Sequence, residues 1–359
     1  MTQDDQTAIA KANAAHQRAM SMPRLLDYGM DFADATALFA RTGAGEAWHE
    51  VAAQLGRERL SRADRAETEG LAFTAAEERQ RAIAALVFAQ MAFNFDVPEK
   101  RALYDELVSV CHALGRVSDL PFARCEASFG DRRLIGWLVR PLSSRAAGTV
   151  VLFGGQSGWG IAYLPVARAL ARRNLATLLV EGPGQGETRM EQGIYLDVDT
   201  DAAYSAWIDV ILDDPTLGTP GIWGNSYGGL WAARTAAHDK RIAACCVNGS
   251  FATPGILPFR SAFEQSAAML GTEDRDALEA NFARLRFDPT AMRIDCPLLV
   301  LHGGADPLVN LPDQQPFLEA ATGEATLKTW PDGDHTIYNH SFDRTTLVAD
   351  WFAARLALR

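Results

Sequence analysis

Three residues in the C-terminal half of the chain have the types and the order of a nucleophilic site. Ser226 lies in the segment 224–228, Gly-Asn-Ser-Tyr-Gly, which fits the G-x-S-x-G pattern of a sharp strand-to-helix turn. Asp306 and His335 each follow an apolar, strand-like run further along the chain. Imidazole can take the proton of a serine hydroxyl, and a carboxylate can fix the imidazole tautomer. The pattern predicts Ser226 as nucleophile, His335 as base and Asp306 as acid.

Two other carboxylates lie close to His335 in the same short loop, Asp332 and Asp334. Either is an alternative acid, but a carboxylate so near in a tight loop reaches Nδ1 of its neighbour with difficulty. His335 taken alone would be an ordinary histidine of a surface loop. Its position after the last strand-like run, in the chain order Ser, Asp, His, favours a catalytic role.

The nucleophile pattern also needs donors for an oxyanion. The backbone N–H of Tyr227 is the first candidate, because it follows the serine. The second is the N–H of Gly155 or Gln156, in the loop 154–160, Gly-Gly-Gln-Ser-Gly-Trp-Gly. Glycine lets a backbone approach an oxyanion closely, although a plain glycine-rich loop is the alternative. No G-x-G-x-x-G pattern or P-loop lysine is present there, so a nucleotide site is not indicated.

A second glycine-rich loop, 181–187, reads Glu-Gly-Pro-Gly-Gln-Gly-Glu. We expect it to be a tight structural turn beside the site. Direct catalysis by Glu181 or Glu187 is the less favoured interpretation.

Strands and helices alternate after residue 121, which predicts an α/β domain with a mostly parallel sheet. Gly130 and Asp131 indicate a hairpin between the first two strands. In such sheets the active site lies at the carboxyl ends of the strands, where the candidate residues fall. The predicted strands are residues 123–129, 134–139, 149–153, 176–180, 221–223, 243–247, 298–302 and 326–330.

Residues 1–120 are Ala-rich and lack strand patterns. Residues 76–95 predict a buried helix because apolar side chains occupy most of its faces. Pro98 breaks that run, and a further helix follows over 103–114 with Gly115 as its stop. A turn at 42–45 separates earlier helices. The chain thus divides into a helical N-terminal domain, 1–120, and a catalytic domain, 121–359.

The composition of the chain limits the kinds of partner that the protein is expected to bind. The net charge of −11 over 359 residues, without a Lys/Arg-rich run, argues against nucleic acid. The N-terminus lacks a signal-peptide pattern, and no apolar run reaches the roughly 18 residues of a membrane span. We therefore expect a cytoplasmic protein with no membrane partner, and with no metal or other cofactor, because no cluster has metal-ligand spacing. The cysteines are odd in number and are expected to be reduced: Cys111, Cys125, Cys245, Cys246 and Cys296.

Four segments together carry a resemblance to a known family: 182–186, 224–229, 302–306 and 332–335. They resemble the branch of the α/β hydrolases with an N-terminal helical domain, which includes 2,6-dihydroxypseudooxynicotine hydrolase. The resemblance implies the α/β-hydrolase fold, the triad Ser226, Asp306 and His335, and an N-terminal cap that covers the site and assists a homodimer.

The branch member cleaves a carbon–carbon bond next to a ketone, and the resemblance implies an extra carboxylate after the strand 243–247. Residues 249–262 contain no Asp or Glu, and the first acid is Glu264. An ester and a ketonic carbon–carbon bond therefore both remain open as the bond that is cleaved.

The expected function is hydrolysis at an acyl carbon of a small molecule through an acyl-serine, and we expect that molecule to be aromatic. A plain carboxylesterase or lactonase and an acyltransferase are alternatives, and a non-catalytic binding protein is a remote one. Five aromatic residues are candidates for an apolar substrate pocket, with ordinary core packing as the alternative for each. They are Trp159, Phe251, Phe259, Phe263 and Tyr338.

Overall fold

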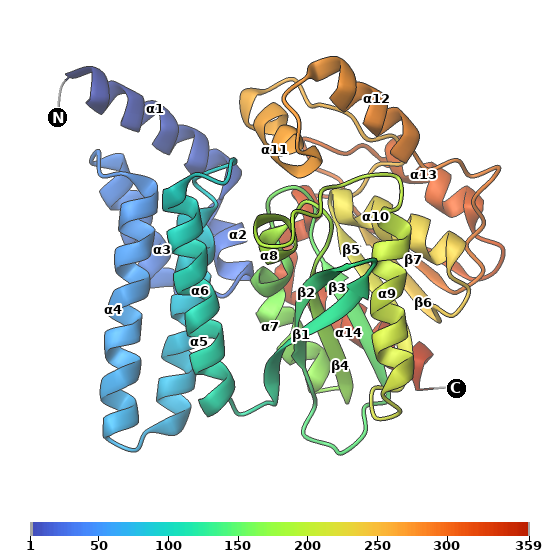
Figure 1. Ribbon diagram of the computed structural model, residues 1–359, viewed down its shortest axis with the longest axis horizontal. Coiled ribbons are helices and arrows are strands. Elements are labelled where there is room, and N and C mark those ends of the chain that lie inside the picture. The colour runs from blue at the N-terminus through green and yellow to red at the C-terminus, as the bar shows by residue number, and fades with distance from the viewer. Residues whose placement is uncertain (1–2, 358–359) are drawn as a thin grey trace. The chain divides into compact units, whose positions relative to one another are not determined.

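The computed structural model describes residues 3–357, which form two compact units. One unit ends at Phe122 and the other begins at Ala123. Figure 1 shows helices alone in the first unit and a sheet with surrounding helices in the second. The cap and dimer roles of the first unit stay predictions.

Six helices make up the N-terminal unit: α1 (Gln3–Ala19), α2 (Met22–Asp27), α3 (Phe32–Gly43), α4 (Trp48–Thr68), α5 (Ala72–Gln90) and α6 (Pro98–Val117). The helix α5 packs between α4 and α6 (Figure 1) and is buried along most of its length. Asp31 caps α3 by accepting the N–H of Ala33, and Pro98 opens α6, where its missing N–H costs nothing.

Two helix ends predicted from the sequence are wrong. The helix α5 ends at Gln90 instead of residue 95, because the chain turns there and Lys100 donates to the carbonyl of Phe93 at 2.7 Å. The helix α6 runs past Gly115 to Val117. A Cβ on Gly115 would lie 2.7 Å from the carbonyl oxygen of Phe122, so this glycine permits close packing instead of ending the helix.

The apolar segment at the end of α5 has partners inside the helical unit itself. The ring of Phe88 is buried and stacks on Tyr28 with centroids 5.5 Å apart. Phe93 makes an edge contact with His49 at 4.9 Å. Part of the apolar surface at the end of α5 is therefore buried by contacts within the helical unit.

The C-terminal unit contains an eight-stranded sheet in the order β1-β2-β4-β3-β5-β6-β7-β8. The strand β2 pairs antiparallel with β4, and every pairing from β4 through β8 is parallel. This confirms the predicted fold class, and each predicted strand lies within two residues of an observed one. The strands are β1 (Phe122–Phe129), β2 (Arg132–Val139), β3 (Gly148–Phe153), β4 (Leu175–Glu181), β5 (Thr219–Asn225), β6 (Ala244–Asn248), β7 (Leu298–Gly303) and β8 (Ala325–Trp330).

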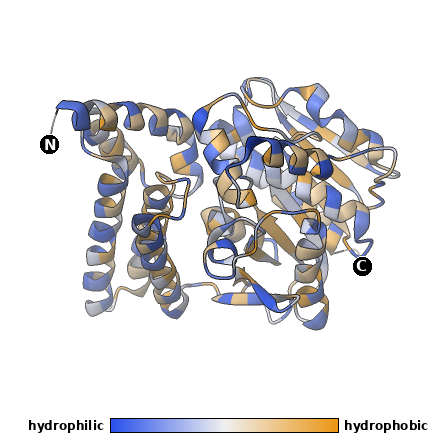
Figure 2. Ribbon diagram, turned by 45° about the horizontal axis from the view of Figure 1, so that its top comes forward, coloured by the Kyte–Doolittle hydropathy of each residue, from blue (hydrophilic) through white to orange (hydrophobic). Residues whose placement is uncertain are grey.

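Helices flank this sheet. On one side α7 packs against α14, and elsewhere α9 packs against α10, which contacts β5 and β6. Strands β3 to β7 are buried except at Thr219, the half-buried first residue of β5, and Figure 2 shows hydrophobic residues concentrated in the sheet. The helical elements are η1 (Gly160–Tyr163), α7 (Leu164–Ala171), α8 (Gly186–Met190), α9 (Thr200–Asp213), α10 (Tyr227–His238), α11 (Arg260–Leu270), α12 (Arg275–Leu285), α13 (Leu311–Ala320), η2 (His335–His340) and α14 (Ser341–Leu356).

Within residues 3–357, none of the helices combines the length and the apolar character that a membrane crossing requires. The cytoplasmic location stays a prediction.

Candidate active site

Ser226 occupies a strained turn between β5 and α10. Its φ of 56° and ψ of −130° are unusual for a residue with a side chain. The turn is possible because two neighbours are glycine. A Cβ on Gly224 would lie 1.9 Å from the carbonyl oxygen of Gly228, and one on Gly228 would lie 2.6 Å from that of Gly154. The sequence thus forces the serine out of the sheet at the carboxyl end of β5.

The structure brings Ser226, His335 and Asp306 into one hydrogen-bonded chain. His335 Nε2 lies 2.9 Å from Ser226 Oγ, and its Nδ1 lies 2.8 Å from Asp306 Oδ2. The Asp306 carboxylate is fully buried, and its Oδ1 accepts the N–H groups of Leu308 at 2.8 Å and Val309 at 3.2 Å. This arrangement can remove the serine proton and hold the resulting imidazolium beside a carboxylate.

The alternative acids have other partners. Asp332 Oδ1 lies 2.9 Å from His340 Nε2, and Asp334 Oδ1 accepts the N–H of Asn339 at 3.2 Å. Burial raises the pKa of the Asp334 carboxyl above its ordinary value. The geometry therefore favours Asp306 as the partner of Nδ1.

Two of the predicted oxyanion residues, Tyr227 and Gly155, lie beside the serine. Tyr227 is the first residue of α10, so its N–H is one of the first-turn donors that no carbonyl of the helix takes. The loop after β3 approaches it closely, since a Cβ on Gly155 would lie 2.7 Å from the Tyr227 nitrogen. The Gln156 side chain donates to Ser266 Oγ on α11 at 2.8 Å, which ties the same loop to a second element.

The loop after β4 contacts the oxyanion loop through one side chain that the sequence reasoning did not single out. Gln185 is 1% exposed. Its Nε2 donates to the carbonyls of Gly154 at 3.0 Å and Gly155 at 2.7 Å. Its Oε1 accepts the N–H of Gly182 at 2.9 Å. A glutamine between glycines, adjacent to a candidate oxyanion loop, is the only sequence signal for this role.

Glu181 ends β4 and is fully buried. Its Oε2 accepts the N–H of Glu187 at 2.6 Å, while its Oε1 has no hydrogen-bond partner among the described residues. Burial, and after it the nearby Glu187 carboxylate, raise the pKa of Glu181 well above its ordinary value. Glu187 itself forms an ion pair with Arg124 at 3.0 Å. These contacts agree with a structural role for both carboxylates.

The turn after His335 was also missed. Thr336 and Ile337 have φ values of 56° and 64°, in the left-handed region that β-branched residues rarely adopt. The Thr336 carbonyl accepts hydrogen bonds from Arg344 Nη1 and from Asn248 Nδ2, each at 3.0 Å. Asn248 Nδ2 also donates to Asn225 Oδ1 at 2.8 Å, next to the serine. No local pattern links these side chains, which come from α14, β6 and β5.

The five aromatic residues predicted to contact substrate differ in their neighbours and in their exposure. Phe251 is buried with its ring at a right angle to that of Tyr227, 4.5 Å away. The indole N–H of Trp159 donates to the Gln156 carbonyl at 3.4 Å, and the guanidinium of Arg189 lies 5.2 Å from the Trp159 ring.

The other three differ in exposure. Phe259 precedes α11 and is 44% exposed, while Tyr338 in η2 is buried. Phe263 lies on α11, with the Arg275 guanidinium 5.4 Å from its ring. Substrate contact by these five residues stays a prediction.

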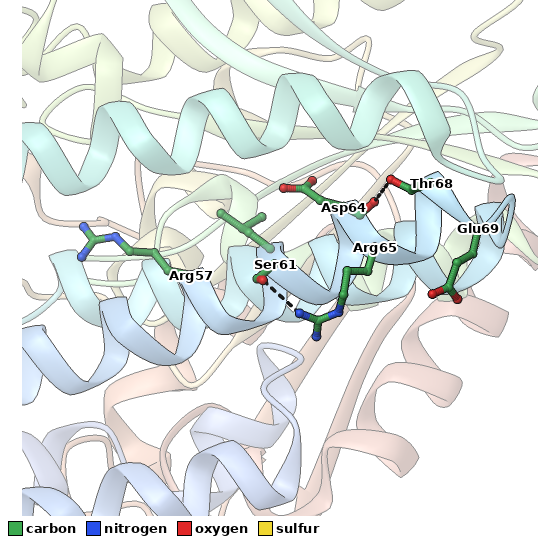
Figure 3. A pocket seen from close by; sticks show the side chains of 7 residues that line it. Arg57, Ser61, Asp64, Arg65, Thr68 and Glu69 are labelled. Carbon is green, nitrogen blue, oxygen red and sulfur yellow. Dashed lines mark hydrogen bonds between the residues drawn. The ribbon is translucent and has the colours of Figure 1, made fainter.

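Residues 3–357 contain no group of three or more His, Cys, Asp or Glu side chains arranged to hold a metal ion. An open hollow lies on α4, lined by Arg57, Leu60, Ser61, Asp64, Arg65, Thr68 and Glu69 (Figure 3). Arg65 donates to Ser61 and Thr68 donates to the Asp64 carbonyl along α4, while Arg57 pairs with Glu106 on α6 and the Asp64 carboxylate pairs with Arg79 on α5. It resembles a solvated helix surface, not a catalytic site.

Comparison with known proteins finds relatives that agree with the observed fold. The profile of the prolyl oligopeptidase family matches residues 218–359, the part that contains Ser226, Asp306 and His335. A 2,6-dihydropseudooxynicotine hydrolase of Paenarthrobacter nicotinovorans is 27% identical over 209 residues. That match spans 56% of this chain and 56% of the relative.

Solved structures resemble a larger share of the chain. A crystal structure of 2,6-dihydroxy-pseudo-oxynicotine hydrolase superposes with a TM-score of 0.84 at 22% identity, covering 93% of this chain and 95% of that one. The structure of AbyA5 wildtype superposes with a TM-score of 0.68 at 18% identity, covering 90% of this chain and 95% of that one. These likenesses confirm the resemblance predicted from the sequence: the chain has the α/β-hydrolase fold, in the form that carries an N-terminal helical region.

Proposed function

We propose that this protein is a hydrolase with Ser226 as nucleophile, acting on an acyl carbon of a small molecule. The observation that carries the proposal is the hydrogen-bonded chain from Ser226 Oγ through His335 to the buried Asp306. The location of these residues at the carboxyl ends of β5, β7 and β8 supports it. The similar proteins are named as hydrolases, which supports the reaction class.

In the first half of the reaction, Oγ of Ser226 attacks the acyl carbonyl while Nε2 of His335 takes its proton. The carbonyl oxygen gains negative charge, which the N–H of Tyr227 and that of Gly155 or Gln156 stabilise. Asp306 stabilises the imidazolium. When the tetrahedral intermediate collapses, the imidazolium returns the proton to the leaving group, and the acyl group stays on the serine.

In the second half, a water molecule gives its proton to His335 and attacks the acyl-serine. The second tetrahedral intermediate expels Ser226, which recovers its proton, and a carboxylic acid leaves. The two halves use the same oxyanion donors, so one constellation serves both steps.

An ester and a ketonic carbon–carbon bond differ only in the group that leaves. An ester releases an alcohol oxygen, whereas a ketone must release carbon that can carry the electron pair until it is protonated. The relatives named after pseudooxynicotine favour a ketone, whereas the lack of Asp and Glu in residues 249–262 favours an ester. We keep both bonds in the proposal.

A fluorophosphonate probe tests the nucleophile. The wild-type protein should become labelled, Ser226→Ala should not, and Ser261→Ala on α11 should label like the wild type. Loss of the nucleophile should reduce kcat by on the order of 10⁶. A Ser226→Ala protein that keeps more than about a tenth of the activity would remove this serine from the mechanism, as would labelling at another residue.

A substrate panel separates the two bonds. p-Nitrophenyl esters and aryl lactones would be compared with β-diketones and acylphenols at matched concentrations. Turnover of esters alone would establish the carboxylesterase or lactonase alternative, and acyl transfer to added alcohols in preference to water would establish an acyltransferase. A protein that neither labels nor turns over any of these would be a binding protein on a hydrolase fold.

We also propose that the helical unit caps the site and contributes to a homodimer, on the strength of the family resemblance. Light scattering of the full chain tests the dimer. A chain of residues 121–359 that is soluble, monomeric and unchanged in its preference between bulky and small esters would contradict the cap.

A further inference from the structure

We propose that Gln185 is a positioning residue for the oxyanion hole: its amide sets the direction of the Gly155 and Gln156 N–H groups. The inference rests on the proposed serine chemistry and goes further, by assigning a residue outside the triad. Gln185 comes from the loop after β4, whereas the candidate donors come from the loop after β3. One side chain therefore joins two strand ends beside Ser226.

The argument follows from the planarity of the peptide bond. The Gly154 carbonyl and the Gly155 N–H belong to one peptide unit, and the Gly155 carbonyl and the Gln156 N–H belong to the next. In a planar trans unit, the direction of the carbonyl determines the opposite direction of the N–H. Gln185 Nε2 donates to both carbonyls, so it orients both candidate donors.

The same contacts should strengthen the donors. A carbonyl that accepts a hydrogen bond polarises its peptide unit, so that the N–H on the other side becomes a better donor. Gln185 Nε2 supplies one N–H to each of the two carbonyls. A stabiliser of developing negative charge works best when it is oriented before the reaction starts.

Gln185 is itself held in place. Its backbone N–H donates to the Gly182 carbonyl at 3.0 Å, and its Oε1 accepts the Gly182 N–H. Its carbonyl accepts the N–H of Arg189 at 2.9 Å in the first turn of α8. The head group needs one acceptor and two donors in a plane, which only a carboxamide offers. Glutamine at this position is therefore explained by chemistry that a turn-forming role alone does not require.

The test uses three variants of the full chain, with rates expressed per fluorophosphonate-reactive site so that unfolded protein is not counted. Gln185→Met keeps the approximate shape of the side chain and removes all three of its side-chain hydrogen bonds. Gln185→Glu keeps an acceptor for the Gly182 N–H but removes the donors. Gln192→Met is the control, because Gln192 follows α8 and accepts only the Arg133 N–H, at 3.3 Å, among the contacts seen.

With p-nitrophenyl acetate, Gln185→Met should lower kcat by about 10- to 100-fold, with KM within about threefold of the wild type. The affinity for trifluoroacetophenone, which forms an oxyanion on the serine, should fall in parallel with kcat/KM. The pH profile of kcat/KM should not change. Gln185→Glu should lose at least as much activity as Gln185→Met, and Gln192→Met should behave like the wild type.

Two results would overturn the proposal. If Gln185→Glu restored wild-type kcat, the residue would only shape its own turn. If Gln185→Met matched Gln192→Met in kcat and in ketone affinity, it would not position the donors.

An independent measurement separates this inference from the proposed function. In protein labelled with ¹⁵N-glycine, the Gly155 amide resonance should shift in Gln185→Met and stay in place in Gln192→Met, whether or not an ester is hydrolysed. An unmoved Gly155 resonance refutes the positioning role. Absence of all esterase activity and labelling in the wild type refutes the proposed function instead.

Discussion

The backbone on the two sides of Ser226 is placed in two different ways. On the oxyanion side, glycines let the backbone come close to the serine. On the base side, buried side chains hold the backbone in place. The oxyanion side, residues 154–156 and 182–186, is rich in glycine and is held by the amide of Gln185 and by the contact of Gln156 with Ser266. The base side, Asp306 and residues 335–337, contains left-handed Thr336 and Ile337, fastened by Arg344 and Asn248.

This difference separates two ways of making a precise site. Glycine removes steric conflict but leaves the chain free, so a fastening contact must supply the order. A left-handed β-branched residue costs on the order of 1–3 kcal/mol, which the surrounding contacts must offset. We expect damage on the oxyanion side to lower kcat without moving the pH profile, and damage on the base side to change both.

The largest effect should come from the base itself. His335→Ala should lower kcat by on the order of 10⁶, and Asp306→Asn by about 10⁴, because the wrong tautomer leaves the serine without a base. Asp334→Asn is the matched control and should be close to wild type. Steady-state hydrolysis of p-nitrophenyl acetate measures all three. A neutral Asp306→Asn beside a severe Asp334→Asn would reverse the choice of acid.

Among substitutions on the oxyanion side, Gly155→Ala should lower kcat the most. The new methyl group would lie 2.7 Å from the Tyr227 nitrogen, where an oxyanion needs access. We expect kcat to fall by about 10²–10³ with an unchanged pH profile. Gly43→Ala, whose Cβ meets nothing within 4 Å, controls for the substitution itself. A wild-type rate for Gly155→Ala would show that the second donor lies elsewhere.

Arg344→Met tests the fastening of the base side. One of the two donors to the Thr336 carbonyl disappears, so the left-handed turn loses part of its support and His335 is less well oriented. We expect kcat to fall about tenfold, together with a shifted pH profile. Arg355→Met is the control on the same helix, since Arg355 pairs with Glu324 near the surface. If Arg344→Met changed only the melting temperature, its role would be structural alone.

The smallest effect concerns Glu181 and appears in stability, not in rate. Burial raises the pKa of this carboxyl, so the folded state keeps a proton that the unfolded state loses above its ordinary pKa of about 4.3. Stability contributed by that proton is therefore complete at low pH and is lost as pH rises toward the folded-state pKa, at up to about 1.4 kcal/mol per pH unit.

Glu181→Gln should remove this slope. Chemical denaturation of both proteins between pH 5 and pH 9 should show the variant gaining stability relative to the wild type as pH increases. A difference that does not depend on pH would mean that the group is ionised when folded.

The glycine-built side was largely visible in the sequence. G-x-S-x-G located Ser226, and the glycine run after β3 located Gly155 and Gln156, because each motif reports a local backbone requirement. The eight strands were likewise found from their apolar runs. The structural role of such residues can be predicted from a few neighbouring positions in the sequence.

The base side was predicted only in part. His335 and Asp306 were predicted from their order after strands, and the structure brings the two side chains together. Arg344 and Asn248 were not predicted, since their hydrogen bonds join α14 and β6 to a turn distant in the chain. The predicted ends of α5 and α6 were wrong for the same reason, because tertiary contacts of Lys100 and Phe122 determine where these helices end.

The outer position of β8 has a consequence for how the protein loses activity. In the order of the sheet this strand is last, and its first five residues are exposed, whereas β7 beside it is fully buried. Its last residue, Trp330, pairs with Gly303 and lies five residues before His335 in the chain. Exposed backbone hydrogen bonds open first, so amide exchange should be faster in β8 than in β7. Under mild denaturant the base would then leave Ser226 while the sheet is still intact, and enzyme activity would report local opening instead of global unfolding.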